Sequence, residues 1–439
     1  MTTRWRARSG RAALALLLTA VAGVTACSGP EATSCGADGV GPITFATVKN
    51  LTPGQRTQLT EAWKLVHPDE PVEIVVLPAT SDEQRAQLAA TLQVRDRGGA
   101  GRRDGYDVVG LDVVFLAEFA RRGFLEPLNK LRYDGDRFLK VPWRNSFFDD
   151  RLYAVPYTTN VGLLYYWADE LAEMRVIADP DTRWQPADWQ TVRKVARDSL
   201  AAASGPAGYT GQLAAYEGLT ANALELIWAE GGDLPTPGHP VGRAELDNAA
   251  RGVEFLLDGV RNRWIDESAL GFDEQASLNA FGGGKALIMR HWPDAWPTLS
   301  RVREHRIGVT RLPGRGSAVL GGESLAVGHC SPYRATAEEF VAFLTSAEQQ
   351  RWIFRAGLYL PTVEDLYTDG SLTADGVLPP YFVRLLHESV NDARGRPADP
   401  AWYGTSRIVQ DEIHRAMERS ATAAVDSEDV ITELADQLN

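Results

Sequence analysis

The chain has 439 residues, of which 44% are hydrophobic and 23% are charged, and its formal net charge is −13. This length suits two domains, and the composition is ordinary for a globular protein in water. A net charge this negative argues against nucleic acid and anionic polymers as ligands, and favours a neutral or cationic small molecule.

The chain opens with the features of an export signal. Four arginines without an acid come first: Arg4, Arg6, Arg8 and Arg11. The mainly apolar run that follows, residues 12–24, is shorter than the ~20 residues of a spanning helix. It ends in Val-Thr-Ala before Cys27, which resembles a bacterial lipobox. We therefore expect 1–26 to be a lipoprotein signal peptide, Cys27 to be lipidated, and 27–41 to be a flexible tether at the extracytoplasmic face of the cell membrane.

Cysteine is sparse, with only Cys35 and Cys330 besides Cys27. Export places both in a compartment that permits disulfides, so a Cys35–Cys330 bridge is our hypothesis. Two unpaired cysteines are the alternative.

The first part of the ordered chain alternates strands and helices. Three short runs rich in β-branched and aromatic residues predict strands: 42–47, 72–77 and 106–111. Residues 55–67 and 81–95 carry helical patterns between them, with Ser81 as the expected cap of the second helix and Gln84 three residues on. The order β-α-β-α-β predicts a parallel sheet of an α/β protein.

The rest of the chain keeps the same mixture of elements. Further strands are expected at 161–166, 286–289, 307–309 and 322–327. Further helices are expected at 189–203, 219–230, 243–263 and 337–354. No internal repeat is present, and a large α/β protein with two lobes follows.

Several catalytic signatures fail when they are checked residue by residue. Residues 282–285 share only glycines and a lysine with a phosphate loop, because Asn279 replaces the first glycine and Ala286 the required Ser or Thr. Residues 322–326 do not complete a nucleophile elbow, and the seven histidines form no zinc pattern. We expect no metal, no cofactor and no enzyme activity. A glycoside hydrolase stays open as an alternative, since a carboxylate pair is defined by its separation in space.

Five segments, in order, resemble the extracellular solute-binding proteins of sugar ABC importers. They are residues 107–128, 153–166, 281–293, 358–362 and 396–397. The likeness runs from about residue 42 to the end and is greatest to the trehalose/maltose-type branch. It implies an α/β, two-lobed periplasmic-binding-protein fold (type II) with a ligand cleft between the lobes.

The resemblance also implies which part of the chain forms each lobe. Lobe 1 would hold 42–157 and 308–345, and lobe 2 would hold 158–307 and 346–439. Three crossings between lobes would then lie near 157–160, 306–309 and 343–346.

Transferred by position, the branch's sugar contacts fall on polar and aromatic residues. The candidates are Asp112, Asn160, Glu274, Trp292, Gly322, Arg396 and, as a weaker candidate, Glu217. Trp292 would stack on a sugar ring, Arg396 would supply a planar fork of donors, and Gly322 would let the backbone approach the ligand. The branch often has a carboxylate after the first strand, where this chain has Thr47-Val48-Lys49-Asn50, so strict trehalose specificity is in doubt.

Each candidate has a purely structural explanation as well. Asp112 would be a helix cap, Asn160 a turn residue, and Trp292 a core residue. Arg396 would form a surface salt bridge, and Glu274 and Glu217 would be ordinary charged residues.

The resemblance implies a lipid-anchored, monomeric receptor that captures a disaccharide or short oligosaccharide and delivers it to ABC permease subunits. Closure of the lobes would bury the sugar. A receptor for a non-sugar solute and an envelope scaffold also stay open.

Overall fold

The computed structural model describes residues 39–438, except 50, 79, 98–104, 201–206, 237–238, 303–305, 315 and 377. All of them belong to one compact unit, Cys35–Asn439. The signal peptide, Cys27, Cys35 and most of the tether lie outside the described residues. Cys330 is disulfide-bonded, and its pairing with Cys35 stays a prediction.

A six-stranded sheet, the first sheet, has the order β12-β6-β11-β3-β1-β2. Its strands are β1 (Ile43–Thr47), β2 (Val72–Val76), β3 (Val108–Asp112), β6 (Ala154–Val161), β11 (Leu320–Val327) and β12 (Leu360–Pro361). β1 pairs in parallel with β2 and β3, which confirms the expected β-α-β-α-β order. β11 is antiparallel to both β3 and β6 and so lies in the middle of the sheet.

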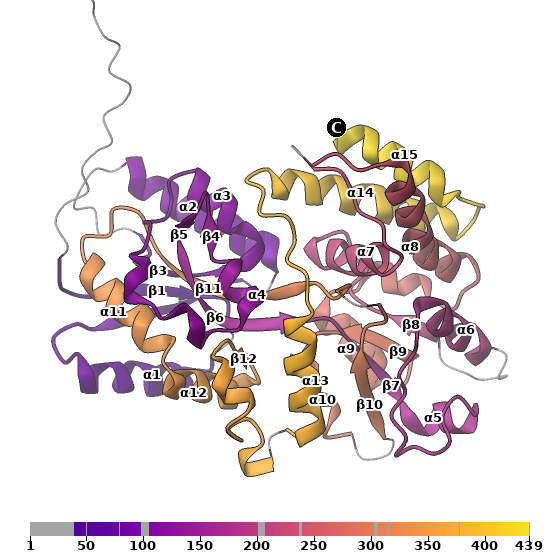
Figure 1. Ribbon diagram of the computed structural model, residues 1–439, viewed down its shortest axis with the longest axis horizontal. Coiled ribbons are helices and arrows are strands. Elements are labelled where there is room, and N and C mark those ends of the chain that lie inside the picture. Colours follow the sequence, from indigo (N-terminus) through magenta and orange to yellow (C-terminus); the bar gives the residue numbers. More distant parts are fainter. Residues whose placement is uncertain are drawn as a thin grey trace, which may run out of the picture. The chain divides into compact units, whose positions relative to one another are not determined.

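Helices beside the first sheet build its core (Figure 1). They are α1 (Pro53–Val66), α2 (Ser81–Arg97), α3 (Leu116–Arg121), α4 (Lys140–Arg144), α11 (Arg334–Leu344) and α12 (Ala347–Gly357). Thr52 and Gln55 form a reciprocal capping box at the start of α1, and Pro53 fills its first turn. Trp63 of α1 is fully buried and meets Phe340 of α11 edge to face, with 5.0 Å between the ring centroids.

Two local expectations were wrong. The side chain of Thr80, not Ser81, accepts from the Glu83 amide at the start of α2, and its hydroxyl donates to the Glu83 carboxylate. Ser81 is therefore free to bond elsewhere. The single helix expected over 337–354 is two helices, because Ser346 caps a new one by accepting from the Gln349 amide.

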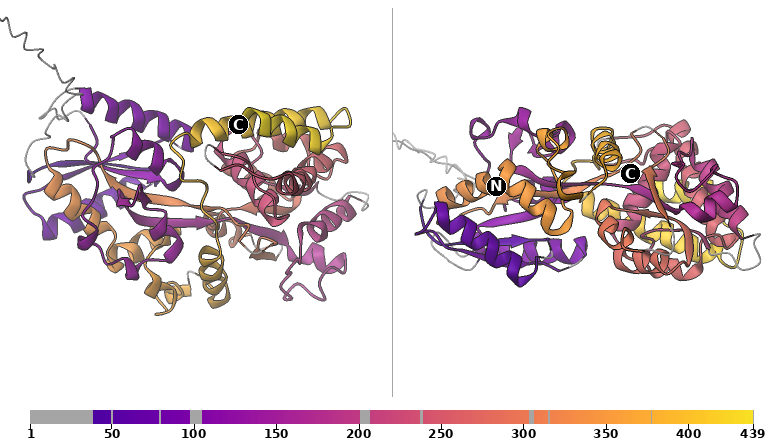
Figure 2. Two further views of the ribbon diagram at one scale, coloured as in Figure 1. Left: turned by 45° about the horizontal axis from the view of Figure 1, so that its top comes forward. Right: turned by 90° about the horizontal axis from the view of Figure 1, so that it is seen from below.

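A four-stranded sheet, the second sheet, has the order β10-β7-β9-β8. Its strands are β7 (Leu163–Trp167), β8 (Ala207–Thr210), β9 (Ala286–His291) and β10 (Ile307–Arg311). The helices near it are α5 (Ala168–Glu173), α6 (Trp189–Ser199), α7 (Glu217–Ala229), α8 (Arg243–Arg261), α9 (Glu274–Gly282), α10 (Trp296–Leu299), α14 (Trp402–Ser420) and α15 (Ser427–Leu438). Helices α7, α8, α14 and α15 pack against one another, and Figure 2 shows the molecule in two further views. A separate hairpin joins β4 (Phe147–Phe148) to β5 (Arg151–Leu152).

The chain passes between the sheets later than expected. The first passage is at Gly162, between β6 and β7, close to the expected position. The second lies between β10 and β11, because residues 308–311, expected in lobe 1, pair with β7. The third follows β12, which pairs with β6 although its residues were expected in lobe 2. Helix α13 (Pro380–Asn391) then packs against both β6 and β10.

Within the described part of the chain, no helix combines the length and the apolar character that crossing a membrane requires.

Candidate functional site

Asp112 ends β3 and faces the start of α2. Its Oδ1 accepts from the amide of Val114 at 3.1 Å, so the role as a cap is present. Its Oδ2 accepts from the hydroxyl of Ser81 at 3.1 Å. The same carboxylate also meets Arg396, which shows that capping does not exhaust its contacts.

Arg396 forms hydrogen bonds with residues from the first sheet and from the helices near the second sheet. Its Nη1 donates to Glu217 Oε1 at 2.7 Å, and its Nη2 lies 3.4 Å from both Asp112 Oδ1 and the Leu320 carbonyl. Only 4% of the side chain is exposed, so this is a buried ion pair and not a surface one. Its Nε has no hydrogen-bond partner among the described residues, which leaves one buried donor to be satisfied.

Glu217 is the first residue of α7 and is the most enclosed of the candidates. Its Oε1 accepts from Trp402 Nε1 at 3.1 Å and its Oε2 from the Ser406 hydroxyl at 2.5 Å. Burial raises the pKa of Glu217, and the neighbouring Arg396 only partly offsets that effect. Asp112, Glu217, Arg396, Trp402 and Ser406 are called the Arg396 cluster below.

Trp292 and Glu274 meet where β9 ends and α9 begins. The indole Nε1 donates to Glu274 Oε1 at 3.4 Å, and the Tyr165 hydroxyl donates to the Trp292 carbonyl at 3.1 Å. Trp292 is half-buried, so its ring is not simply part of the core. Burial, together with the Glu274 carboxylate, raises the pKa of Tyr216 well above its ordinary value.

Asn160 and Trp292 approach each other over Gly321. Asn160 of β6 is the register partner of Gly321 of β11. A Cβ on Gly321 would lie 3.3 Å from Asn160 Cβ and 3.4 Å from the Trp292 ring. The Asn160 side chain makes no hydrogen bond in the described part of the chain. Asn160, Glu274, Arg290, Trp292 and Gly321 are called the Trp292 cluster below.

The backbone conformation and the close packing at Gly322 both require glycine. Its φ is +126°, and a Cβ there would lie 2.3 Å from the Thr158 carbonyl oxygen. The pairing of β11 with β6 therefore requires this glycine, and the expected close approach of a ligand there stays a prediction.

The two clusters meet at the start of β11, because the Leu320 carbonyl accepts from Arg396 and the next residue, Gly321, contacts Trp292. All seven sequence candidates thus lie in or beside one region, although they come from seven separate parts of the chain.

Other residues of this region were missed from the sequence. Arg290 stacks on Trp292, with its Cζ 3.8 Å from the ring centroid. Residues i and i+2 of an extended chain lie on one face, so the spacing of Arg290 and Trp292 in the sequence could have indicated their contact. The buried pair of Lys49 and Glu323, 3.5 Å apart, had no such signal, since 274 positions separate the two residues.

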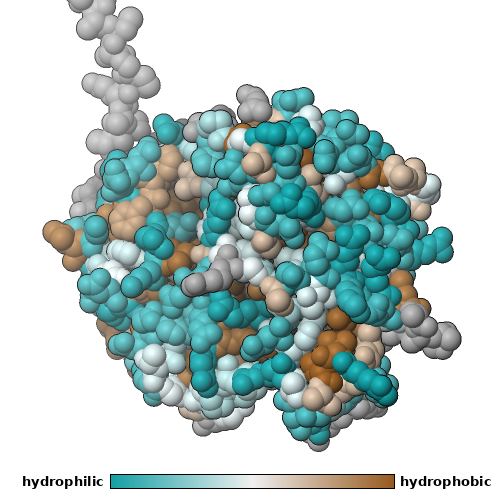
Figure 3. All heavy atoms as spheres, turned by 45° about the vertical axis from the view of Figure 1, so that its right-hand side comes forward, coloured by the Kyte–Doolittle hydropathy of each residue, from teal (hydrophilic) through white to brown (hydrophobic). Residues whose placement is uncertain are grey.

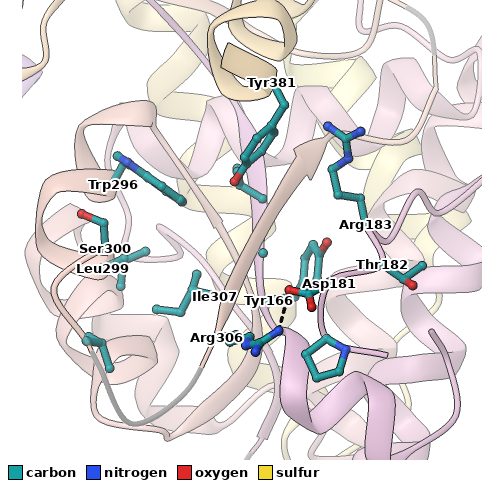
Figure 4. A pocket seen from close by; sticks show the side chains of 14 residues that line it. Tyr166, Asp181, Thr182, Arg183, Trp296, Leu299, Ser300, Arg306, Ile307 and Tyr381 are labelled. Carbon is teal, nitrogen blue, oxygen red and sulfur yellow. Dashed lines mark hydrogen bonds and ion pairs between the residues drawn. The ribbon is translucent and has the colours of Figure 1, made fainter. Parts of the chain in front are cut away.

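Two cavities lie away from these clusters, along β10. One of about 690 Å³ is lined by Tyr166, Arg183, Trp296 and Tyr381 among others (Figure 4), and one of about 640 Å³ adjoins it at Arg183, Val309 and Tyr381. No candidate site residue lines either cavity. The face in Figure 3 is mostly hydrophilic, with apolar patches between polar side chains. The described residues contain no group of His, Cys, Asp and Glu that could hold a metal ion.

Known proteins resemble this chain in sequence and in structure. A family model described as bacterial extracellular solute-binding protein matches residues 62–380. A Deinococcus radiodurans protein named as a probable ABC transporter-binding protein is 30% identical over 268 residues, which are 58% of this chain. The match spans 61% of that relative's length.

Solved structures match nearly the whole chain. The maltose-bound MalE3 of T. maritima has a TM-score of 0.76 and 29% identity, over 90% of this chain and 98% of that one. The GacH receptor of Streptomyces glaucescens, solved without ligand and with acarbose, has a TM-score of 0.72 and 19% identity, over 91% and 97%. UgpB of Mycobacterium tuberculosis, in complex with glycerophosphocholine, has a TM-score of 0.72 and 20% identity, over 91% and 98%. The expected two-lobed solute-binding fold is confirmed by these matches.

Proposed function

Because this chain belongs to the bacterial extracellular solute-binding protein family, we propose that it captures a disaccharide or short oligosaccharide outside the membrane and delivers it to an ABC permease. Cys27 would carry the lipid that tethers it to the cell membrane as a monomer. The family is one of binding proteins, so the expectation that the chain is not an enzyme is confirmed.

One observation carries the sugar proposal: an indole with a carboxylate at its Nε1 lies beside Gly321 at the start of β11, and a buried arginine flanked by two carboxylates bonds to the carbonyl of the preceding residue, Leu320. A half-buried indole offers the apolar face of a sugar ring a stacking surface. The carboxylates of Glu274 and Asp112 accept from hydroxyls, and the free Nε of Arg396 donates. These are the three kinds of contact that a neutral polyol ring needs.

The origin of these residues supports closure on the ligand. Asp112 ends a strand of the first sheet, whereas Glu217, Glu274 and Trp292 belong to elements around the second. A sugar that touches both sets stabilises the closed arrangement of two lobes through contacts made only there. The maltose bound to the T. maritima neighbour agrees with this class of ligand. Because the M. tuberculosis neighbour binds glycerophosphocholine, the experiment that tests the proposal also includes non-sugar solutes.

A thermal-shift screen of the chain from Ser28 onward, against mono-, di- and oligosaccharides, polyols and glycerophosphodiesters, tests the proposal. A ligand at a hundredfold excess over its dissociation constant stabilises the native state by about 2.7 kcal/mol. We expect one disaccharide or short oligosaccharide to raise the melting temperature without being consumed. Consumption would indicate a glycoside hydrolase, a shift with a non-sugar alone would identify another solute receptor, and no shift at all would favour an envelope scaffold.

A further inference from the structure

Arg290 lies directly beneath the ring that is proposed to bind sugar. It belongs to β9, and Trp292, two residues further on, follows that strand in an extended conformation, so both side chains point to the same side. Its guanidinium carbon lies 3.8 Å from the centroid of the indole, which is stacking distance for a cation–π contact. Arg290 covers one face of the indole, and Trp292 is half-buried, so part of its surface stays accessible.

The guanidinium is fully buried and held from three directions. Its Nε donates to Glu225 Oε2 at 2.7 Å and its Nη2 to Glu225 Oε1 at 2.6 Å, a bidentate pair. Its Nη1 donates to Gln212 Oε1 at 2.9 Å. Gln212 Nε2 in turn donates to Ser277 of α9, the helix that begins with Glu274. The network therefore supports both Trp292 and its carboxylate partner.

A gain in folding stability does not explain why the Arg290–Glu225 ion pair is buried. Removing two charges from water is costly, and well-packed apolar residues of similar volume are often as stable or more so. A planar, always-charged group that can stack on an indole and pair with a carboxylate at once is a property of arginine alone.

The ion pair also touches both of the first two passages between the sheets. Glu225 Oε1 accepts from the amide of Val319, which comes just before β11. A Cβ on Gly162, between β6 and β7, would lie 2.2 Å from Glu225 Oε1 and 2.8 Å from Arg290 Nη2. The pair is thus packed against the backbone of both connecting segments.

We propose that Arg290 is a positioning residue for sugar binding: it fixes the plane of the Trp292 ring, and Glu225 fixes Arg290 relative to the two connecting segments. The inference rests on the proposed function, because it takes Trp292 as the stacking surface. Its consequence is that sugar affinity depends on the Arg290–Glu225 pair even though neither residue touches the sugar.

The test variant is Arg290→Met combined with Glu225→Gln. Arg290→Met alone would leave a buried, unpaired carboxylate and could unfold the protein. Glutamine at 225 removes that charge and keeps an oxygen for the Val319 amide. The matched control is Arg193→Met with Asp258→Asn, which removes the ion pair between α6 and α8, 2.9 Å long and with a buried acid, that has no contact with Trp292.

The first readout needs no ligand. The protein is labelled with 5-fluorotryptophan, and the Trp292 signal in the fluorine NMR spectrum is assigned by its loss in Trp292→Phe. We expect this signal to broaden or split in the test variant, because the ring then samples more than one orientation, and to stay single and sharp in the control. A single sharp Trp292 signal in the test variant would overturn the proposal.

The second readout is the dissociation constant of the best sugar from the thermal-shift screen. We expect roughly thirty-fold weaker binding in the test variant, the size of a desolvated cation–π contact, and no change in the control. Equal affinity in test variant and wild type would overturn the proposal while sugar binding itself stands. If the wild type bound no sugar, the proposed function would fail, and the fluorine spectrum would still decide whether Arg290 orients the ring.

Discussion

Arg396 and Asp112 are 284 positions apart in the chain, and Nη2 of the arginine lies 3.4 Å from Oδ1 of the aspartate. The aspartate ends a strand of the first sheet, and the arginine follows α13, which packs against both sheets. Their contact connects the two halves of the proposed sugar site.

Trp292→Ala should abolish measurable sugar affinity, because the stacking face is lost, with little change in thermal unfolding, since the ring is only half-buried. Titration calorimetry and a melting curve check both parts. Trp296→Ala is the matched control, because Trp296 lines the separate cavity along β10 and should leave affinity intact. Unchanged affinity in Trp292→Ala would refute the assignment.

Asp112 should contribute to binding beyond its role as a cap. Asp112→Asn keeps an oxygen for the Val114 amide but loses the charge that faces Arg396 and the sugar. We expect it to weaken sugar binding by about 1–3 kcal/mol, the cost of an unsatisfied buried polar contact. The melting temperature should fall less than in Asp112→Ala, which also loses the cap. Equal sugar affinity in Asp112→Asn and wild type would show that Asp112 acts only as a helix cap.

Glu217 should make stability depend on pH. Burial raises its pKa above the ordinary 4.5, so the folded protein binds this proton more readily than the unfolded chain does. Its contribution to the free energy of unfolding is therefore full below pH 4.5 and is lost as pH rises through the raised pKa. Urea unfolding at a series of pH values from 4.5 upward should show a shallower decline in Glu217→Gln. An unchanged slope would contradict the assignment.

Tyr403 should favour closure without touching the ligand. The guanidinium carbon of Arg85, on α2, lies 3.5 Å from the centroid of the Tyr403 ring, on α14, and Glu118 holds that guanidinium with two bonds of 2.6 Å. Tyr403→Leu removes a contact of about 1 kcal/mol, so sugar affinity should fall about five-fold. Calorimetry measures the change.

The control for Tyr403 is Tyr153→Leu, which removes a longer contact with Arg151, 5.6 Å from the guanidinium carbon to the ring centroid, inside one lobe. Its affinity for sugar should stay that of the wild type. A similar loss in both variants would mean that general destabilisation, and not closure, explains the result.

Gly322→Ala should destabilise the fold strongly. The new Cβ would lie 2.3 Å from the Thr158 carbonyl, so β11 and β6 would have to separate locally. Gly284→Ala is the control, since its φ is +71° but no atom lies within 4 Å of the new Cβ, and it should cost only about 1 kcal/mol. Melting temperatures of the two variants give the comparison, and an equal, small loss in both would show that the β11–β6 approach is not tight.

The sequence predicted most of the fold because its signals are local. Periodicity located β1, α1, β2, α2 and β3 to within a few residues, and the parallel pairing followed from their order. Local details were wrong where a short-range competitor decided them: Thr80 replaces Ser81 as the capping side chain of α2, and Ser346 divides the expected single helix into α11 and α12. The passages between the sheets were placed too early, because periodicity identifies β10 as a strand but not the sheet to which it belongs.

For the site, the sequence by itself determined the chemical types: an indole, carboxylates and an arginine at the ends of elements. Only the tertiary structure decided their partners. It placed Glu217, the weakest candidate, at 2.7 Å from Arg396, and it placed Arg290 against both Trp292 and Glu225. The physical reason is that a strand or helix signal extends over a few neighbouring residues, whereas an ion pair forms between charges that the fold brings within a few ångströms from any distance along the chain.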